Sequence, residues 1–183
     1  IRFSSVGDII LSSLLLRTLH TRFPGSRIDY LVKTEYADLV EGKPHVTEVI
    51  AFPSHGGFQE LKRLRRRIRE TSYDLVVDIH DSLRSRYLCF GIPNVVRIHK
   101  RKLARFLLVK TKWNVNDCFG GSPGVAERYL ETVHTYGVTN DGKGLEIFRP
   151  EAASAKAGKT LLEANIKSGT VIIGVCPSAR HRN

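Results

Sequence analysis

The chain has 183 residues, 42% of them hydrophobic, which is enough for one globular domain with a core and a little more. Its 29 Lys and Arg exceed its 18 Asp and Glu, and the formal net charge of +11 favours anionic partners such as nucleic acid, lipid surfaces or phosphorylated substrates. No window approaches the roughly 18 consecutive apolar residues of a membrane span, and no signal-peptide pattern is visible. The scattered Cys89, Cys118 and Cys176 argue against a disulfide framework and for a reducing compartment.

Strand-like and helical segments alternate along the chain. Residues 1–3 predict the end of a strand, and residues 8–22 predict a helix that stops at Phe23-Pro24-Gly25. Further strands are expected in "RIDYLV", "VTEVIAF", "YDLVVDI", "PNVVRIH" and "GTVIIGVCP", and further helices at residues 34–41 and in "GFQELKRLRRRIRET", "DSLRSRYLCF", "PGVAERYLETVHTYG" and "PEAASAKAGKTLLEANI". The alternation predicts an α/β fold, with a doubly wound, Rossmann-like parallel sheet that carries helices on both faces.

Two features suggest that more than one domain is involved. The stretch "GVTNDGKGLEIFRPE" is rich in turn formers and predicts a linker, so we expect one domain over residues 1–150. Residues 151–183 would then form a linker helix and the first strand of a second domain. Because the sequence contains no Met, we expect Ile1 to lie inside a longer native chain.

The loop after the first strand, "SSVGD", lies where a parallel sheet binds ligands. It lacks the three glycines of the dinucleotide fingerprint and the Gly-Lys-Ser/Thr of a P-loop. Ser4 and Ser5 supply hydroxyls, and Gly7 would let a ligand approach the backbone closely. Asp8 has two interpretations: it is an N-cap of the following helix, or it is a carboxylate that takes a proton from a substrate hydroxyl.

Two basic segments follow. "LKRLRRRIRE" combines an apolar stripe, Leu61, Leu64 and Ile68, with six cations, namely Lys62, Arg63, Arg65, Arg66, Arg67 and Arg69. This pattern fits either a solvated helix face or an anion-binding site. A second run, "RIHKRKLARFLLVKTK", includes Arg97, Lys100, Arg101, Lys102 and Arg105. If both segments reach the same edge of the sheet, they favour a substrate with several negative charges.

Polar residues also follow the strand "YDLVVDI". Arg84 and Arg86 are candidates for anion binding, whereas His80 beside Asp81 is more typical of a polar loop residue than of a catalytic base. Acidic and histidine residues are too dispersed to suggest a metal site.

Several stretches together resemble the ADP-heptose:lipopolysaccharide heptosyltransferases, glycosyltransferase family nine. They are "RFSSVGDIILSSLLLRTLHTRFPGSRIDYLV", "YDLVVDIHDSLRSR", "GVAERYLETV" and "VIIGVCPSARHRN", and they cover nearly the whole chain in order. The resemblance implies the GT-B architecture, in which two doubly wound domains face each other across a cleft. This chain would be the N-terminal, acceptor-binding half, with residues 1–150 as that domain and residues 151–183 leading into a donor-binding domain that it lacks.

The resemblance also implies a reaction, an inverting and metal-independent transfer of a heptose from ADP-heptose to the lipopolysaccharide inner core. Asp8 would be the catalytic base, and no cofactor would be needed. Acceptor binding is expected from Ser4, Ser5, Gly7, Lys62, Arg65, Arg66, Arg84, Arg86, Arg101, Arg105 and Arg128, and donor binding from Ser178 and Arg180. The protein would be cytoplasmic and peripheral at the inner face of the inner membrane of a Gram-negative-type bacterium, and this chain alone is expected to be inactive.

Two other function classes remain open on the residues alone. A basic α/β domain that binds nucleic acid would suit the charge, but aromatic residues make up only 8% of the chain and no nucleic-acid motif is present. A nucleotide-dependent oxidoreductase would suit the sheet but lacks the glycine fingerprint.

Overall fold

The computed structural model describes residues 1–98, 123–147, 151–166 and 169–173. The chain divides into two compact units, Ile1–Phe148 and Arg149–Asn183. The first unit contains the sheet and the site described below. In the second, the described helix is α7, Glu151–Glu163. The assignment of residues 1–150 to acceptor binding remains a prediction.

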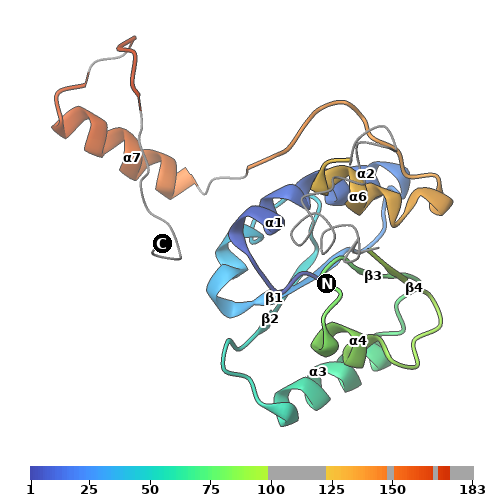
Figure 1. Cartoon of the computed structure of the whole chain (residues 1–183). Helices are drawn as coiled ribbons and strands as arrows, with labels where there is room; N and C mark the ends of the chain where they lie inside the picture. The colour runs from blue at the N-terminus through green and yellow to red at the C-terminus, as the bar shows by residue number, and fades with distance from the viewer. Residues whose placement is uncertain (99–122, 148–150, 167–168, 174–183) are drawn as a thin grey trace, which may run out of the picture. The chain divides into compact units, whose positions relative to one another are not determined.

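Parallel strands form the centre of the first unit. Strand β1 (Asp29–Lys33) pairs with β2 (Glu48–Phe52), and β3 (Val76–Asp78) pairs with β4 (Val95–Arg97). Residues 1–3 lie between the two pairs (Figure 1). The backbone N–H of Arg2 donates to Leu31 O at 3.0 Å, and the amino group of Ile1 donates to Val77 O at 2.7 Å. The carboxyl ends of these segments therefore meet at one edge.

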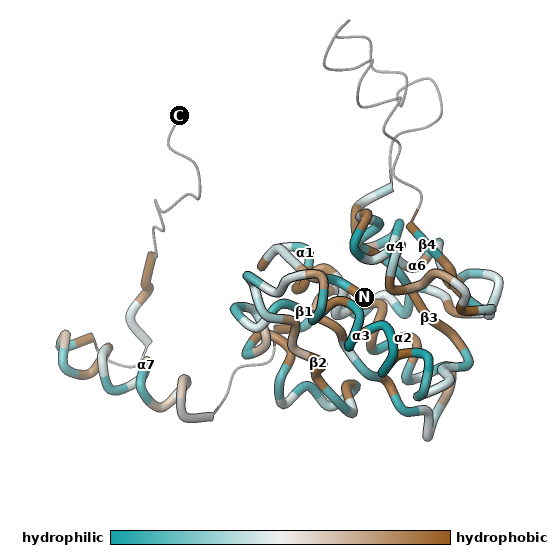
Figure 2. Tube along the Cα trace, turned by 90° about the horizontal axis from the view of Figure 1, so that it is seen from below, coloured by the Kyte–Doolittle hydropathy of each residue, from teal (hydrophilic) through white to brown (hydrophobic). Residues whose placement is uncertain are grey.

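Helices cover both faces of this layer. On one face α3 (Phe58–Thr71) and α4 (Leu83–Cys89) pack against β1 and β2, and on the other α1 (Val6–Leu11), α2 (Ser13–Arg22) and α6 (Val125–Glu131) lie against the strands. Within β1, Leu31 packs in the cluster that faces α3 and α4. Tyr30 and Val32 pack in the cluster that faces α1 and α2, as the alternation of side chains along a strand requires. Figure 2 shows β3 in the hydrophobic colour between these layers. The predicted α/β fold with parallel strands is confirmed.

Three predicted elements differ in detail. The helix expected at residues 8–22 begins at Val6 and is interrupted at Ser12, whose hydroxyl donates to Ile9 O at 2.7 Å and bonds with the Tyr30 hydroxyl at 2.8 Å. A serine hydroxyl that bonds to the preceding helical turn competes with the helix ladder, which fits the break there. Residues 34–41 yield a 3₁₀-helix, η1 (Thr34–Leu39), and the segment after α6 adds η3 (His134–Tyr136).

The last predicted strand is wrong in the part that the structure describes, because residues 170–173 form no strand. The rest of that stretch lies outside the described residues.

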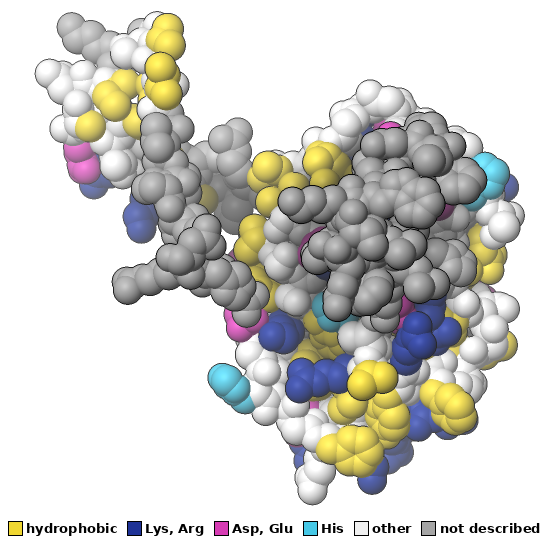
Figure 3. Space-filling view, viewed as in Figure 1, with side chains coloured by type: hydrophobic (Ala, Val, Ile, Leu, Met, Phe, Trp, Pro, Cys, Tyr) yellow, Lys and Arg dark blue, Asp and Glu magenta, His cyan; other side chains and the backbone are white. Residues whose placement is uncertain are grey.

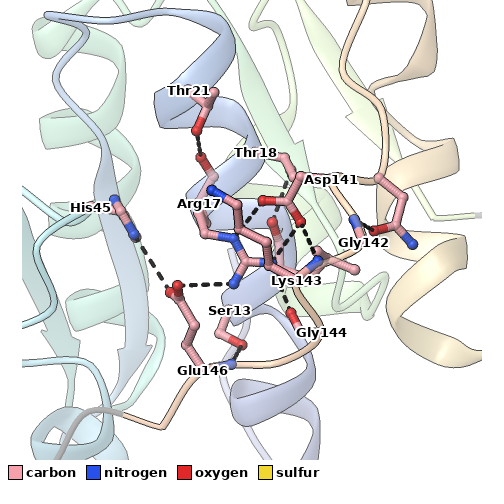
Figure 4. A network of polar contacts seen from close by, with 12 residues as sticks. Ser13, Arg17, Thr18, Thr21, His45, Asp141, Gly142, Lys143, Gly144 and Glu146 are labelled. Atoms are coloured by element: carbon pink, nitrogen blue, oxygen red, sulfur yellow. Dashed lines mark hydrogen bonds and ion pairs between the residues drawn. The ribbon is translucent and has the colours of Figure 1, made fainter.

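A polar network holds the segment that follows η3 against α2 (Figure 4). Arg17 is only 6% exposed, and its Nε and Nη2 each donate to Asp141 at 2.7 Å. Its Nη1 pairs with Glu146 at 2.9 Å, and the Ser13 hydroxyl accepts from the Glu146 backbone N–H at 2.9 Å. The hydrogen bonds from Arg17 lower the pKa of Asp141 to about 2. A buried guanidinium therefore fixes the chain at residues 141–146.

We expect Asp141→Asn to lower the free energy of unfolding at pH 7 by about 1–2 kcal/mol, because it removes a charge-assisted pair and leaves Arg17 with fewer partners. The Asp141 pKa is depressed on folding, so its contribution is present above the ordinary pKa of 3.8 and is lost as pH falls toward about 2. Urea unfolding of wild type and variant should thus show a gap that narrows below pH 4. Asp74→Asn, at an exposed carboxylate, is the matched control; an equal loss in both variants would contradict the assignment.

Candidate active site

Asp8 lies in the first turn of α1, at the carboxyl edge of the sheet. Its Oδ2 accepts from the Ser5 hydroxyl at 2.9 Å and from the Ser5 backbone N–H at 3.3 Å. Ser5 is the N-cap residue and Asp8 is the third residue of the helix, the position whose side chain reaches back in a capping box. The interpretation of Asp8 as the N-cap itself is therefore wrong by three positions, although its carboxylate does cap the helix start.

Two further side chains reach Asp8 from distant parts of the chain. Arg2 forms an ion pair with Oδ2, and its Nη1 also donates to Ile79 O at 2.8 Å. The hydroxyl of Tyr129, in α6, donates to Oδ1 at 3.2 Å, and the Arg2 guanidinium lies 5.9 Å from the centre of the Tyr129 ring. Tyr129 is 1% exposed, whereas the Asp8 side chain retains 29% of its exposure. A cation and a phenol thus hold a carboxylate that solvent still reaches.

The charge state of this group follows from its neighbours. Burial raises the pKa of Asp8, but the hydrogen bonds from Ser5 and the positive charge of Arg2 outweigh burial, and the pKa is lowered overall. Burial and the nearby Asp8 carboxylate raise the pKa of Tyr129 to about 12. At neutral pH Asp8 is ionised and Tyr129 remains a hydrogen-bond donor.

The two carboxylate oxygens of Asp8 differ in their surroundings. In the described part of the chain, three donors from Ser5 and Arg2 lie on Oδ2, whereas Oδ1 accepts one bond, from the Tyr129 hydroxyl at 3.2 Å. A carboxylate oxygen has two lone-pair directions, so Oδ1 retains capacity for another donor. Chemically, the arrangement can accept a proton from a hydroxyl placed at this edge.

The loop after β3 completes the edge. Asp78 is fully buried, and its Oδ1 accepts from the backbone N–H groups of His80 at 3.1 Å and Asp81 at 2.9 Å. The His80 ring packs edge-on against Phe3 at 5.3 Å, and Asp81 accepts from Arg86 at 2.6 Å. Through these contacts Asp78 and Asp81 stabilise the conformation of the loop after β3.

The cations of α3 are less free than the sequence suggested. Arg63 pairs with Glu60 at 2.8 Å, Arg66 with Glu70 at 2.7 Å, and Arg67 with Glu48. Neighbouring helix turns and β2 therefore supply carboxylates to half of the six cations in this run. Across the described residues, no hydrogen bond or ion pair joins an α3 cation to Asp8.

The remaining predicted site residues are dispersed. Ser4 and Gly7 flank Ser5 and Asp8, Arg84 is exposed on α4, and Arg128 is half-buried in α6 beside Tyr129. Arg101, Arg105, Ser178 and Arg180 lie outside the described residues. Sequence reasoning missed Arg2 and Tyr129. Arg2 lies two residues before Ser4, so its nearness to the loop could have been noticed, whereas Tyr129 is 121 positions from Asp8.

The described residues also show a cavity elsewhere in the fold, but no cluster of metal-binding side chains and no membrane-spanning helix. A cavity of about 370 Å³ lies beside the amino-terminal ends of β1 and β3, with Ile1, Asp29 and Leu75 in its wall and neither Asp8 nor Tyr129 among its lining residues. The described residues contain no group of three or more His, Cys, Asp or Glu side chains that could hold a metal ion. Over the same part of the chain, no helix is long and apolar enough to cross a membrane.

We expect Arg2→Gln to raise the pKa of Asp8 toward its ordinary value, because the variant removes the opposite charge nearest to the carboxylate. Carboxyl ¹³C NMR titration of wild type and variant measures this directly. Arg27→Gln removes a guanidinium that pairs instead with Asp29 and Glu48, so it should leave the Asp8 titration unchanged. An Asp8 pKa that is the same with and without Arg2 would contradict the electrostatic account.

Comparison with known proteins finds relatives that are similar over nearly the whole chain. No family model matches the chain. Lipopolysaccharide heptosyltransferase 2 of Salmonella typhimurium is 30% identical over 186 residues, and that of Escherichia coli is 28% identical over 192 residues. In both cases the match covers 96% of this chain and 52% of the relative.

Solved structures agree in fold. The glycosyl transferase family 9 structure from Veillonella parvula superposes with a TM-score of 0.71 at 19% identity, over 96% of this chain and 52% of that one. ADP-heptose lps heptosyltransferase II of E. coli gives 0.62 at 22% identity, over 98% of this chain and 54% of that one. The chain spans about half the length of the curated relatives that it matches. Over nearly all of its own length and about half of theirs, the chain is similar in sequence to these lipopolysaccharide heptosyltransferases, and it shares the fold of the two solved structures.

Proposed function

We propose that this chain is the acceptor-binding half of a GT-B glycosyltransferase that moves a heptose from ADP-heptose to the lipopolysaccharide inner core. The observation that carries the proposal is the ionised, partly exposed Asp8 at the carboxyl edge of a parallel sheet, in a homologue of the heptosyltransferases. Ligands of such sheets bind at that edge. The doubly wound topology and the facing donor domain belong to the proposal.

In the proposed reaction Asp8 Oδ1 takes the proton of the acceptor hydroxyl. The acceptor oxygen attacks the anomeric carbon of the heptose, the bond from that carbon to the diphosphate oxygen breaks, and ADP leaves, so the configuration inverts. A low pKa keeps Asp8 ionised but makes it a weak base. Exclusion of water when the two halves close would raise its basicity during transfer.

The cations near the edge suit an anionic acceptor. Arg84 and Arg128 are the described candidates, since Arg86 is already paired with Asp81. Arg101 and Arg105 are proposed for the same role, and Ser178 and Arg180 for the donor phosphates. The proposal assigns no step to a metal ion; amides and cations would balance the charge that grows on ADP. A cytoplasmic location at the inner membrane follows from such an acceptor.

The test is Asp8→Asn in a protein that joins this chain to its donor-binding half. We expect kcat to fall about 10²- to 10⁴-fold, the range that a positioned general base contributes, while ADP-heptose affinity and thermal stability change little. Asp38→Asn, an exposed carboxylate in η1, is the matched control and should retain activity. Turnover by the Asp8 variant close to wild type would end the base assignment.

The pH profile gives a separate check on Asp8. Because the folded pKa of Asp8 lies below the ordinary value of 3.8, kcat/KM should not fall on acidification until the pH is below about 4. A decline centred between pH 5 and 7 would point to another base.

A further inference from the structure

The outer side of α3 and α4 carries apolar side chains that the fold leaves in solvent. Phe58 is 60% exposed, Leu83 88% and Phe90 70%. In most soluble domains large apolar groups at this exposure are scattered singly, and a contiguous group marks an interaction surface. Phe58 and Phe90 are linked through Tyr87 and Arg65, and Leu83 lies on the same side of α4 as Tyr87.

Ring contacts connect the group across the two helices. The Phe58 ring lies 5.5 Å from that of Tyr87, and the Arg65 guanidinium lies 4.9 Å from the Tyr87 ring and 5.3 Å from the Phe90 ring. Arg65 also donates to Phe90 O at 3.0 Å. Leu83 is four residues before Tyr87 in α4, so it lies on the same side of that helix. We call this surface, made of Phe58, Leu83, Tyr87 and Phe90 with the cations between them, the α3–α4 face.

Cations are interleaved with these apolar groups. Lys62 Nζ lies 4.9 Å from the centre of the Phe58 ring, and an open groove on the face is lined by Lys62, Arg65, Arg66, Arg69, Glu70 and Tyr87. Figure 3 shows hydrophobic and Lys/Arg side chains lying side by side at the lower end of the molecule, where Figure 1 places α3 and α4. Lys62 and Arg69 have no carboxylate partner in the part of the chain that the structure describes.

We infer that the α3–α4 face binds the surface of an anionic lipid bilayer, with Phe58, Leu83 and Phe90 entering the headgroup region and Lys62 and Arg69 binding lipid phosphates. A basic surface with projecting aromatic and leucine side chains binds a membrane interface in two ways: the apolar side chains are buried among the headgroups, and the cations are attracted to anionic lipids. A nucleic acid would use the cations and could stack on Phe58 and Phe90, but it gives no partner to the aliphatic Leu83, the most exposed of the three. The inference goes beyond the transfer reaction, because it needs neither Asp8 nor an acceptor saccharide.

The experiment is sedimentation of the chain with vesicles that contain no lipopolysaccharide. Vesicles of phosphatidylglycerol and phosphatidylethanolamine should bind at least about tenfold more tightly than phosphatidylcholine vesicles, and binding should weaken with salt. The triple variant Phe58→Ser, Leu83→Ser, Phe90→Ser should lose at least about tenfold in affinity for the anionic vesicles. Ile147→Ser, which replaces another side chain that is 67% exposed, should bind like wild type.

A charge variant separates the two parts of the surface. Lys62→Glu with Arg69→Glu should lose at least about tenfold in affinity, because each cation near an anionic lipid surface contributes attraction that its reversal removes, whereas Lys156→Glu in α7 should bind like wild type. Circular dichroism checks that each variant is folded. Equal binding to neutral and anionic vesicles, an unaffected serine variant, or tighter binding to a single-stranded oligonucleotide than to the vesicles would overturn the inference. Failure of the Asp8 experiment with vesicle binding intact would remove only the proposed transfer.

Discussion

The guanidinium of Arg2 is the contact on which the candidate site depends. The Arg2 backbone is hydrogen-bonded to β1. Its guanidinium donates to Ile79 O, just after β3, and pairs with Asp8 in α1. The same group lies 5.9 Å from the centre of the Tyr129 ring in α6. Three separate elements are thus tied together at one edge of the sheet. The same positive charge offsets the burial of Asp8 and keeps its carboxylate ionised, so the packing of the edge and its chemistry have one cause.

The capping role and the proposed catalytic role of Asp8 use different atoms. Oδ2 satisfies the helix start through Ser5 and pairs with Arg2, which fixes the carboxylate in place. Among the described residues, Oδ1 accepts a hydrogen bond only from the Tyr129 hydroxyl, at 3.2 Å. A base must be both held and available, and dividing these tasks between two oxygens meets both needs. The sequence already allowed Asp8 to be both cap and base, and the geometry assigns a different oxygen to each role.

Local patterns predicted the elements well, and distant contacts escaped prediction. Leu61, Leu64 and Ile68 are buried as their helical spacing indicated, because that spacing depends only on neighbouring residues. The break at Ser12 depends on Tyr30, in the next strand, and the bond between Asp8 and Tyr129 depends on how α6 packs. No periodicity in a single sequence records such pairs. Asp8 could be placed at the ligand edge from topology alone, but its partner Tyr129 could not.

The cations of α3 and the cation beside Asp8 have different surroundings. Glu48, Glu60 and Glu70 neutralise three α3 arginines, so the helix offers a smaller excess of charge than its sequence suggests. The α3 cations without a carboxylate partner lie among exposed rings, whereas Arg2 lies at the edge and pairs with Asp8. Cations beside exposed apolar side chains suit a partner surface that is both anionic and apolar. Cations at the edge beside Asp8 suit a soluble anionic ligand. Under the proposed function, an acceptor saccharide carried on a lipid would present both at once, so these two groups of cations would serve two surfaces rather than one cleft.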